Sequence, residues 1–304
     1  MDLSDLRTFL AVARTKGITA AGRELNTVQS NVTTRIKSLE EEIGAALFTR
    51  HSRGMILSDA GQRLLPYAER LMALSQEAKA AARDDGVPRG HLAIGSMETT
   101  AAVRLPALLA QFHRACPEVK LSLRTGPTAQ LVEGVLARDF DAAFVAGPLE
   151  HPGLRAQAAF EEELVLITQR DIRTLDQLRG ASADGLTALM FRIGCSYRQR
   201  LEQVLADLGY RAYARLELGT LDGILGCVAA GVGITLLPRA VVEQSAHADE
   251  LRCHDLPPSL SLVATLLVVR DDLRPGVAFE RFKDILQGLP APAGGRSLAS
   301  TAAG

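Results

Sequence analysis

The chain has 304 residues, of which 47% are hydrophobic and 23% charged, and its formal net charge is −1. This length predicts about two domains, each with room for a buried core. The balanced charge excludes a bulk polycation or a protein with an acidic tail, but it leaves room for a local nucleic-acid-binding patch. Tryptophan is absent and aromatic residues make up 4%, which argues against base-stacking platforms for single strands.

Targeting signals and metal motifs are missing from the sequence. The N-terminus has no basic stretch before an apolar core, so we expect no secretory signal. The longest uncharged run, residues 223–238, is shorter than the roughly 20 helical residues that span a bilayer. We therefore expect a soluble, cytoplasmic protein that makes no membrane contact. The cysteines Cys116, Cys195, Cys227 and Cys253 lack CxxC spacing, which predicts free thiols and no metal site.

The first 57 residues predict three helices and a hairpin. Apolar residues at helical spacing indicate a first helix from Leu3 that Gly17 ends, a short second helix over 18–25, and a third helix over 29–43. Residues 47–57 then predict a small hairpin with a basic tip. This order is typical of a winged helix-turn-helix domain, with the third helix as the recognition helix.

The long helix expected from Asp59 to Arg83 begins after Ser58, a suitable N-cap. Its apolar residues recur at alternating steps of three and four, at Leu64, Tyr67, Leu71, Leu74, Ala78 and Ala81. Such a heptad seam predicts a coiled coil with a second copy, and packing on its own domain is the alternative. Pro66 is a point where this helix can kink.

From His91 onward, strands alternate with helices, as in an open, mainly parallel α/β sheet. We expect strands at 92–95, 119–124, 141–145, 163–168, 187–192, 212–217, 233–237 and 260–269. We expect helices near 99–115, 128–138, 174–179, 197–208, 221–231 and 279–286. The two sets of elements predict two similar lobes, with the chain crossing between them near 160 and 265.

These elements predict an α/β fold class with the following domain organisation. The DNA-binding domain covers 1–58, the linker helix and hinge 59–90, and the two-lobed domain 91–290. Lobe I takes 91–161 and 266–290, and lobe II takes 162–265. Residues 291–304 are rich in Ala, Gly, Pro and Ser, which predicts a disordered tail.

The third helix carries a polar stretch without any acidic residue between Val28 and Leu39. Gln, Asn and Arg can bond base edges in the major groove, and Ser and Thr can reach bases or phosphates. Arginines on the hairpin would neutralise phosphates or enter the minor groove. The alternative is an ordinary solvated helix face. The predicted DNA contacts are Thr27, Gln29, Ser30, Asn31, Thr33, Thr34, Arg35, Lys37, Arg50 and Arg53.

These residues also carry a resemblance to the LysR-type transcriptional regulators. The matching motifs are Leu3-x-x-Leu-x-x-Phe9, Ala20-Ala21, Gln29-x-x-x-Thr-x-x-Ile36-x-x-Leu39-Glu40, Gly44-x-x-Leu47-Phe48-x-Arg50, Leu57-Ser58-x-x-Gly61 and Gly231-x-Gly233-Ile234-x-x-Leu237-Pro238. The chain departs from the family where Pro commonly follows the recognition Gln and Ser lies three places further on; here these are Ser30 and Thr33. The resemblance implies a two-lobed, type-2 periplasmic-binding-protein-like effector domain after the winged helix-turn-helix.

Other functional classes fit the sequence less well. Six histidines form no obvious cluster, and no GxSxG, HExxH or GxxxxGK[ST] motif is present, so we expect no enzyme. A solute-binding protein would need export and no wing. A structural DNA binder would not need a large α/β domain, and it would coat DNA broadly rather than protect one promoter region.

Two-lobed α/β domains bind ligands between the lobes, where strands end and helices begin. Residues 95–100, 125–128, 146–148 and 191–198 are of this kind, and the resemblance implies that the first, second and fourth line an effector pocket. The alternative for each hydroxyl is simple helix capping. The predicted effector contacts are Ser96, Met97, Glu98, Thr99, Gly126, Thr128, Gly147, Arg192, Cys195 and Ser196.

The expected ligand is a small carboxylate or amino-carboxylate. Ser96, Thr99 and the helix start behind them suit an anion, and Arg192 is a candidate carboxylate clamp. Glu98 either complements the helix dipole or pairs with an ammonium group. The run from Phe191 to Arg198 resembles a subgroup linked to sulfur oxidation or to polyamine and aminobutyrate catabolism, which favours a catabolic operon as the target.

A redox-sensing regulator using Cys195 is the alternative function. This cysteine precedes a predicted helix and has Arg192 and Arg198 nearby, and both features lower a thiol pKa. Cys227 and Cys253 could serve as resolving cysteines only through the fold. Otherwise Cys195 is a pocket-wall or core residue.

We therefore expect a homodimer through the 59–83 helices, with tetramers through the effector domains. Two recognition helices imply an interrupted palindrome in promoter DNA. A small-molecule co-inducer, with no other cofactor, would shift an existing equilibrium between placements of the DNA-binding heads. RNA polymerase is a further candidate partner.

Overall fold

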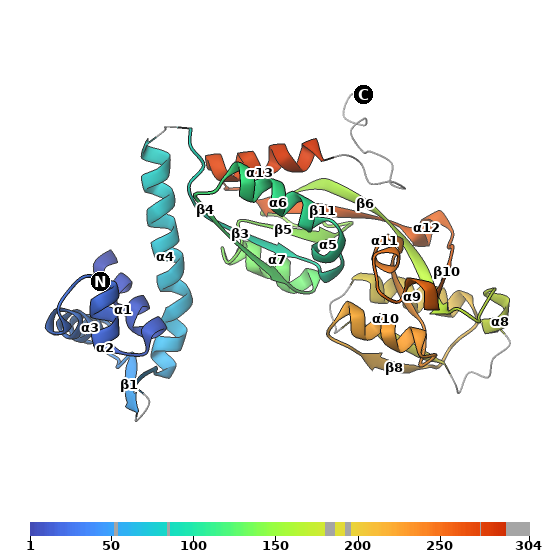
Figure 1. The fold of residues 1–304 in the computed structure, drawn as a ribbon, viewed down its shortest axis with the longest axis horizontal. Helices are drawn as coiled ribbons and strands as arrows, with labels where there is room; N and C mark the ends of the chain where they lie inside the picture. Colours follow the sequence, from blue (N-terminus) through green and yellow to red (C-terminus); the bar gives the residue numbers. More distant parts are fainter. Residues whose placement is uncertain (52–53, 84–85, 180–185, 192–195, 274, 290–304) are drawn as a thin grey trace. The chain divides into compact units, whose positions relative to one another are not determined.

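The computed structural model describes residues 1–51, 54–83, 86–179, 186–191, 196–273 and 275–289 (Figure 1). Contacts divide the chain into two compact units, Met1–Gly86 and Val87–Gly304. The predicted disordered tail, 291–304, lies outside the described residues, as does Arg53 on the predicted wing.

The first unit is a three-helix head followed by a hairpin and a long helix. Its elements are α1 (Leu3–Thr15), α2 (Ile18–Glu24), α3 (Gln29–Ile43), β1 (Phe48–His51), β2 (Gly54–Leu57) and α4 (Asp59–Arg83). Leu6, Phe9, Val32, Ile36 and Leu39 form its buried centre, at the helical spacing that the sequence shows. The predicted winged helix-turn-helix is thus present.

The end of α1 differs from the prediction by one residue. Lys16, not Gly17, takes the left-handed conformation that ends the helix, with φ of 55°. Gly17 has extended backbone and instead begins α2. The glycine that the sequence assigns to the end of α1 is therefore the N-cap of α2.

The turn between α2 and α3 is tight. The Thr27 amide donates to the Gly22 carbonyl at 2.8 Å, and a Cβ on Gly22 would lie 2.9 Å from the Thr27 carbonyl oxygen. Only glycine fits this approach without a shift. The turn fixes the angle at which α3 leaves α2.

The hairpin is anchored at both ends. The Met55 amide donates to the Lys16 carbonyl at 2.9 Å, which holds β2 against the end of α1. Ser58 caps α4, because its Oγ accepts from the Gly61 amide at 3.1 Å, and it also donates to the Ala46 carbonyl. A Cβ on Gly61 would lie 2.2 Å from the Leu47 carbonyl oxygen, so α4 packs directly on the chain leading into β1.

Helix α4 has two apolar faces. Ala60, Leu64, Ala68 and Met72, four residues apart, pack on the core of the head. Tyr67, Leu71 and Leu74 are 59%, 39% and 57% exposed. The predicted seam is therefore divided, because Leu64 belongs to the head whereas Tyr67, Leu71 and Leu74 remain accessible on this chain.

The second unit is built on a seven-stranded sheet in the order β10-β6-β11-β5-β3-β4, with β9 also paired to β6. These strands are β3 (Gly90–Ser96), β4 (Val119–Thr125), β5 (Ala142–Ala146), β6 (Leu154–Gln169), β9 (Thr235–Pro238), β10 (Leu251–His254) and β11 (Leu262–Arg270). Strand β3 is parallel to β4 and β5, whereas β11, β9 and β10 run antiparallel to β6. The sheet is mixed rather than mainly parallel, which corrects the expectation from the sequence.

The remaining elements cover this sheet or form lobe II. Helices of lobe I are α5 (Glu98–Val103), α6 (Leu105–Ala115), α7 (Thr128–Leu136) and α13 (Val277–Gly288). Lobe II contains β7 (Thr187–Met190) parallel to β8 (Ala214–Glu217), with α8 (Asp176–Arg179), α9 (Ser196–Asp207), α10 (Leu221–Ala229), α11 (Arg239–Glu243), the 3-10 turn η2 (Ala248–Glu250) and α12 (Pro258–Ser261).

Strand β6 carries the chain from one lobe to the other (Figure 1). Its residues 154–163 pair with β11, and its residues 164–169 pair with β9 and β10. Two cores result, one around Phe112, Phe144 and Phe282 in lobe I, and one centred on the buried half of β6. The crossing strand is therefore part of both lobes.

Candidate functional site

The N-terminal half of α3 presents polar side chains to solvent. Gln29, Ser30, Asn31, Thr34 and Lys37 are exposed, whereas Val32, Ile36 and Leu39 are buried in the head. The amphipathic division matches the sequence pattern. This exposed face lies at the position in a helix-turn-helix that enters the major groove.

Local hydrogen bonds hold several of these side chains in place. Thr19 on α2 donates from Oγ1 to Gln29 Oε1 at 3.2 Å, and Asn31 donates from Nδ2 to Thr27 Oγ1 at 2.9 Å. The hydroxyls of Thr33 and Thr34 donate to the carbonyls four residues earlier, Gln29 and Ser30. Thr19 is thus a positioning residue for Gln29 that the sequence analysis missed, because it lies on another helix.

Arg35, another predicted DNA contact, pairs with carboxylates at the start of α1. Its NH1 is 3.0 Å from Asp5 Oδ1 and 3.8 Å from Asp2 Oδ1, at the start of α1. The acid-free stretch around Arg35 predicted a DNA contact, but the fold places Asp5, 30 residues away in the sequence, beside its guanidinium. We assign Arg35 to the packing of α3 on α1 rather than to base contacts.

Glu40, one of the acidic residues at the far end of α3, has a structural role. Glu40 Oε1 accepts from the Leu47 amide at 2.7 Å and from the Phe48 amide at 3.3 Å, so it holds the start of the wing. Of the predicted wing contacts, Arg53 lies outside the described residues and the side chain of Arg50 is also undescribed. Lys16, exposed beside the wing, is a basic residue that the sequence analysis did not select.

In the second unit, the first predicted effector segment is mostly closed. Ser96 is fully buried and donates from Oγ to the Met97 carbonyl at 3.0 Å, and Met97 is buried as well. Helix α5, which starts at Glu98, has six residues and ends before Arg104. A short helix with an occupied serine hydroxyl is a weaker anion site than the sequence predicted.

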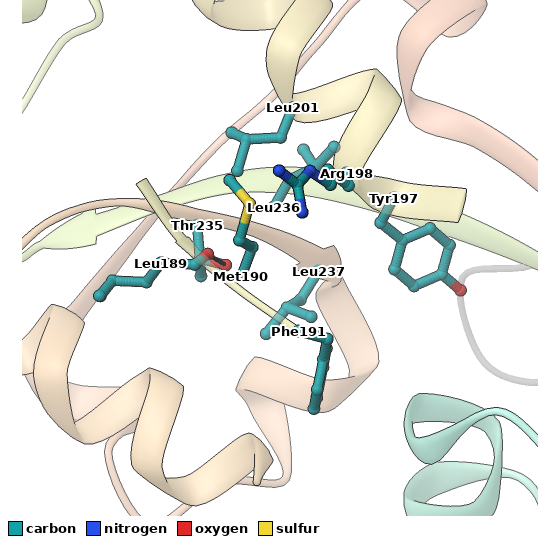
Figure 2. A pocket seen from close by; sticks show the side chains of 9 residues that line it. All are labelled: Leu189, Met190, Phe191, Tyr197, Arg198, Leu201, Thr235, Leu236 and Leu237. Carbon is teal, nitrogen blue, oxygen red and sulfur yellow. Dashed lines mark hydrogen bonds between the residues drawn. The ribbon is translucent and has the colours of Figure 1, made fainter. Parts of the chain in front are cut away.

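Thr99 is the member of this segment that reaches the other lobe. Its Oγ1 is 3.5 Å from the hydroxyl of Tyr197 on α9, and both residues are buried. Figure 2 shows the Tyr197 hydroxyl pointing away from the other labelled side chains of lobe II. Tyr197 lies within the predicted run 191–198 but was not among the selected residues.

The neighbouring Thr100 has a buried hydroxyl with no hydrogen-bond partner in the described part of the chain. A helical threonine usually donates to a carbonyl three or four residues earlier. Here the Ser96 carbonyl already accepts from Gly126 N–H, and the Met97 carbonyl accepts from Ala101 N–H and the Ser96 hydroxyl. Thr100, the last residue of the predicted segment, therefore has an unused donor.

The second and third predicted segments lie near the first. The Gly126 amide bonds the Ser96 carbonyl at 3.1 Å, and Thr128 begins α7. The Gly147 amide bonds the Ala264 carbonyl at 2.7 Å, where β11 enters lobe I. The fold brings Ser96 and Gly126 together.

The fourth segment is only partly described. Arg192 and Cys195 lie outside the described residues, and Ser196 begins α9 with its side chain undescribed. Phe191 and Tyr197, on either side, border a small hollow in lobe II (Figure 2). Apolar side chains make up most of its lining, including Leu189, Met190 and Leu201.

Two of the polar residues of this hollow, Thr235 and Arg198, are engaged with their own lobe. Thr235 donates from Oγ1 to the Leu189 carbonyl at 2.7 Å. Arg198 pairs with Glu202 at 3.3 Å and with Glu217 at 3.2 Å. The hollow as described suits an apolar group better than an anion.

Two arginines, one from each lobe, form ion pairs with adjacent glutamates of the crossing strand β6. Arg104, between α5 and α6, makes two bonds to Glu162 at 2.8 and 2.7 Å, with the side chains 13% and 2% exposed. Arg239, at the start of α11, bonds Glu163 at 2.9 Å and also pairs with Asp255. The carboxylate partners raise the pKa of both arginines above the ordinary value, so both remain charged.

The described residues contain no group of three or more His, Cys, Asp or Glu side chains placed to hold a metal ion. Within the same ranges, no helix combines the length and apolar character needed to cross a membrane.

Comparison with known proteins covers both units. The family model described as "Bacterial regulatory helix-turn-helix protein, lysR family" matches residues 3–62, and the LysR substrate binding domain matches residues 85–290. The HTH-type transcriptional regulator GltR of Bacillus subtilis (strain 168) is 41% identical over 90% of this chain and 91% of that protein. The uncharacterized HTH-type transcriptional regulator YusT of the same organism is 43% identical over 93% of this chain and 95% of that protein.

Solved structures share the fold at lower identity. Full-length CbnR complexed with its target DNA aligns with a TM-score of 0.68 and 24% identity, over 94% of this chain and 99% of that chain. A mutant OxyR from Corynebacterium glutamicum aligns with a TM-score of 0.61 and 22% identity, over 94% of this chain and 91% of that chain. The matched families and curated relatives are transcriptional regulators, not enzymes.

Proposed function

Because the chain belongs to the LysR family of bacterial transcriptional regulators, we propose that it controls a promoter through the exposed face of α3. The observation that carries this proposal is the row of polar side chains on α3 that the head leaves in solvent while it buries Val32, Ile36 and Leu39. Amide and hydroxyl side chains at the start of a recognition helix can bond base edges.

The proposed DNA contacts divide into two groups. Bases are contacted from α3 and the turn before it, by Thr27, Gln29, Ser30, Asn31, Thr33 and Thr34. Phosphates are contacted by cations at the edges of this surface, Lys37, Arg50 and Arg53. Arg35 is left out of both groups because Asp5 holds its guanidinium.

We propose that the chain acts as a dimer through α4, with tetramers through the effector domains. Tyr67, Leu71 and Leu74 form an exposed apolar stripe on a different face of α4 from the residues that pack on the head. Two copies of the stripe could bury each other in heptad register. Two heads then call for two half-sites in the operator.

The effector is proposed to bind between the lobes of the second unit. Thr99 and Tyr197 meet there from opposite lobes, and the unpartnered Thr100 hydroxyl lies one residue away. A small carboxylate or amino-carboxylate that controls a catabolic operon is the proposed class, with Arg192 as its clamp and RNA polymerase as a downstream partner. Calorimetry with matched carboxylate, amino acid and diamine series on the full chain tests this class.

Selection of bound duplexes from random DNA, followed by affinity measurements, tests the DNA-binding proposal. Gln29→Ala should weaken binding to the selected site by about 1–3 kcal/mol and leave non-specific binding nearly unchanged. Glu41→Ala, at the other end of α3, is the matched control and should keep the sequence preference. If wild type and Gln29→Ala bound the selected site with equal affinity, α3 would not contact the bases in this register.

The redox alternative has less support. Cys195 lies outside the described residues, and burial raises the pKa of Cys253, which disfavours the reactive thiolate. The likeness to OxyR concerns the fold. No contact among the described residues favours a thiol switch, so we propose effector control instead.

A further inference from the structure

Val28 occupies an unusual place in the head. At 67% exposure it is the most exposed large apolar side chain among the described residues. It lies directly before α3, with the extended backbone of a helix N-cap, and makes no side-chain capping bond. An isopropyl group thus stands in solvent at the start of the recognition helix.

The residue preferences of helix N-caps disfavour valine at this position. Ser, Thr, Asn and Asp are strongly preferred as N-caps because their oxygens bond the first helical amides. Asp2, Ser58 and Thr220 do this for α1, α4 and α10. The packing of the head offers no compensation, because most of the Val28 side chain stays in water. Residues that break local rules without structural gain are expected at functional sites.

The neighbours of Val28 are held by hydrogen bonds. Thr27 accepts from Asn31, and Gln29 accepts from Thr19. Valine is β-branched and stiff at χ1, so its methyl groups point in a defined direction from a backbone position that lies between these two residues in the sequence. A rigid apolar group among bonded polar ones is suited to contact a fixed apolar feature of the major groove.

The major groove offers one such feature, the C5-methyl group of thymine. We propose that Val28 reads a thymine methyl in each operator half-site, while the polar residues of α3 bond neighbouring base edges. The inference rests on the proposed DNA-binding function and adds a base identity to it. Val28 would then contribute to sequence specificity although its side chain cannot form a hydrogen bond.

The test uses DNA duplexes selected by the wild-type protein from random sequences. Each thymine is replaced in turn by deoxyuridine, which removes one methyl group and keeps every hydrogen-bonding atom. Burial of one methyl group corresponds to about fourfold in affinity. We expect one substitution per half-site to weaken wild-type binding by about this factor, and Val28→Ser to bind the thymine and deoxyuridine duplexes equally.

Two controls separate recognition from folding. Val28→Ser supplies a better N-cap, so the melting temperature of the variant should stay level or rise while its discrimination is lost. Ile43→Ser, at an exposed apolar position at the far end of α3, should keep the wild-type discrimination between thymine and deoxyuridine.

The outcomes are distinct. The inference fails if the wild-type protein binds the thymine and deoxyuridine duplexes equally. It also fails if Val28→Ser still prefers the thymine duplex. In both cases the proposed function stands. If the wild-type protein selects no duplex at all, the proposed function fails first, and the inference falls with it.

Discussion

His254 lies at the end of β10, where it is 7% exposed and its Nε2 is 2.9 Å from Thr168 Oγ1. Burial, together with the nearby Arg252 charge, lowers the pKa of His254 below its ordinary value. The folded protein therefore keeps this ring neutral at a pH where the unfolded chain would protonate it.

The sign of the pH effect follows from this difference in bound protons. Between the lowered pKa of His254 in the folded protein and about pH 6.5, the unfolded chain binds more protons at this residue than the folded protein does, so stability should fall as the pH drops through this window. Thermal unfolding at pH 8 and pH 5.5 measures the loss. His254→Gln should lose less stability between these two values than the wild type, and equal losses would contradict the assignment.

Single side chains also show where sequence reasoning stops. The polar face of α3 could be predicted because helical spacing alone decides which residues the head buries. The ion pair of Arg35 with Asp5 could not, because it depends on how α3 packs on α1. The same holds for Ser96, which the sequence offers as a free hydroxyl and the fold turns to the Met97 carbonyl.

At the scale of elements, α4 shows how one helix serves two partners. A stripe at 60, 64, 68 and 72 fits the head, and a second stripe at Tyr67, Leu71 and Leu74 remains accessible. The heptad count alone assigned Leu64 to the outer seam. Only the packing of the head separates the two stripes.

Leu71→Asp tests the outer stripe. A charge there cannot be buried without a large desolvation cost, so the variant should sediment as a monomer and bind the full palindrome weakly. Gln62→Asp is the matched control, because it adds the same charge at an exposed position of α4 outside the stripe. A dimer of native size in Leu71→Asp would mean that α4 is not the main interface.

Other elements were predictable to different degrees. The helix expected over 99–115 is two helices, and Pro106 in the first turn of α6 was a visible signal for the break. The first half of β6 was missed because residues 154–159 are mostly small or polar and show no apolar alternation. Its pairing with β11 makes it a strand, and that pairing is not local. Strand β10 and the short helices α11 and α12 were missed as well.

At the scale of the whole effector unit, the crossing strand β6 is the common part of the two lobes. Glu162 and Glu163 are adjacent, so their side chains leave opposite faces of the strand. Arg104 from lobe I takes the first, and Arg239 from lobe II takes the second. The run of glutamates in the sequence gave no sign of these partners.

The Arg104–Glu162 pair is buried, so removing one partner should be costly. Glu162→Gln leaves the guanidinium without its counter-charge and should destabilise the effector unit by about 3–5 kcal/mol in chemical unfolding. The double variant Arg104→Met/Glu162→Leu, which leaves no buried charge, should recover much of this loss. Glu163→Gln, whose side chain is 42% exposed, should cost at most about 1 kcal/mol. Equal effects of Glu162→Gln and Glu163→Gln would contradict this ranking.

The close approach of Gly61 to the Leu47 carbonyl has a mechanical consequence for the DNA-binding unit. At Gly61 no side chain separates α4 from the chain entering the wing. Ser58 bonds the Ala46 carbonyl at the base of the hairpin, and Met55 bonds the Lys16 carbonyl at the end of α1. The base of the hairpin is therefore held directly against the first turn of α4. A rotation of the first turn of α4 about its axis should therefore carry the base of the hairpin with it.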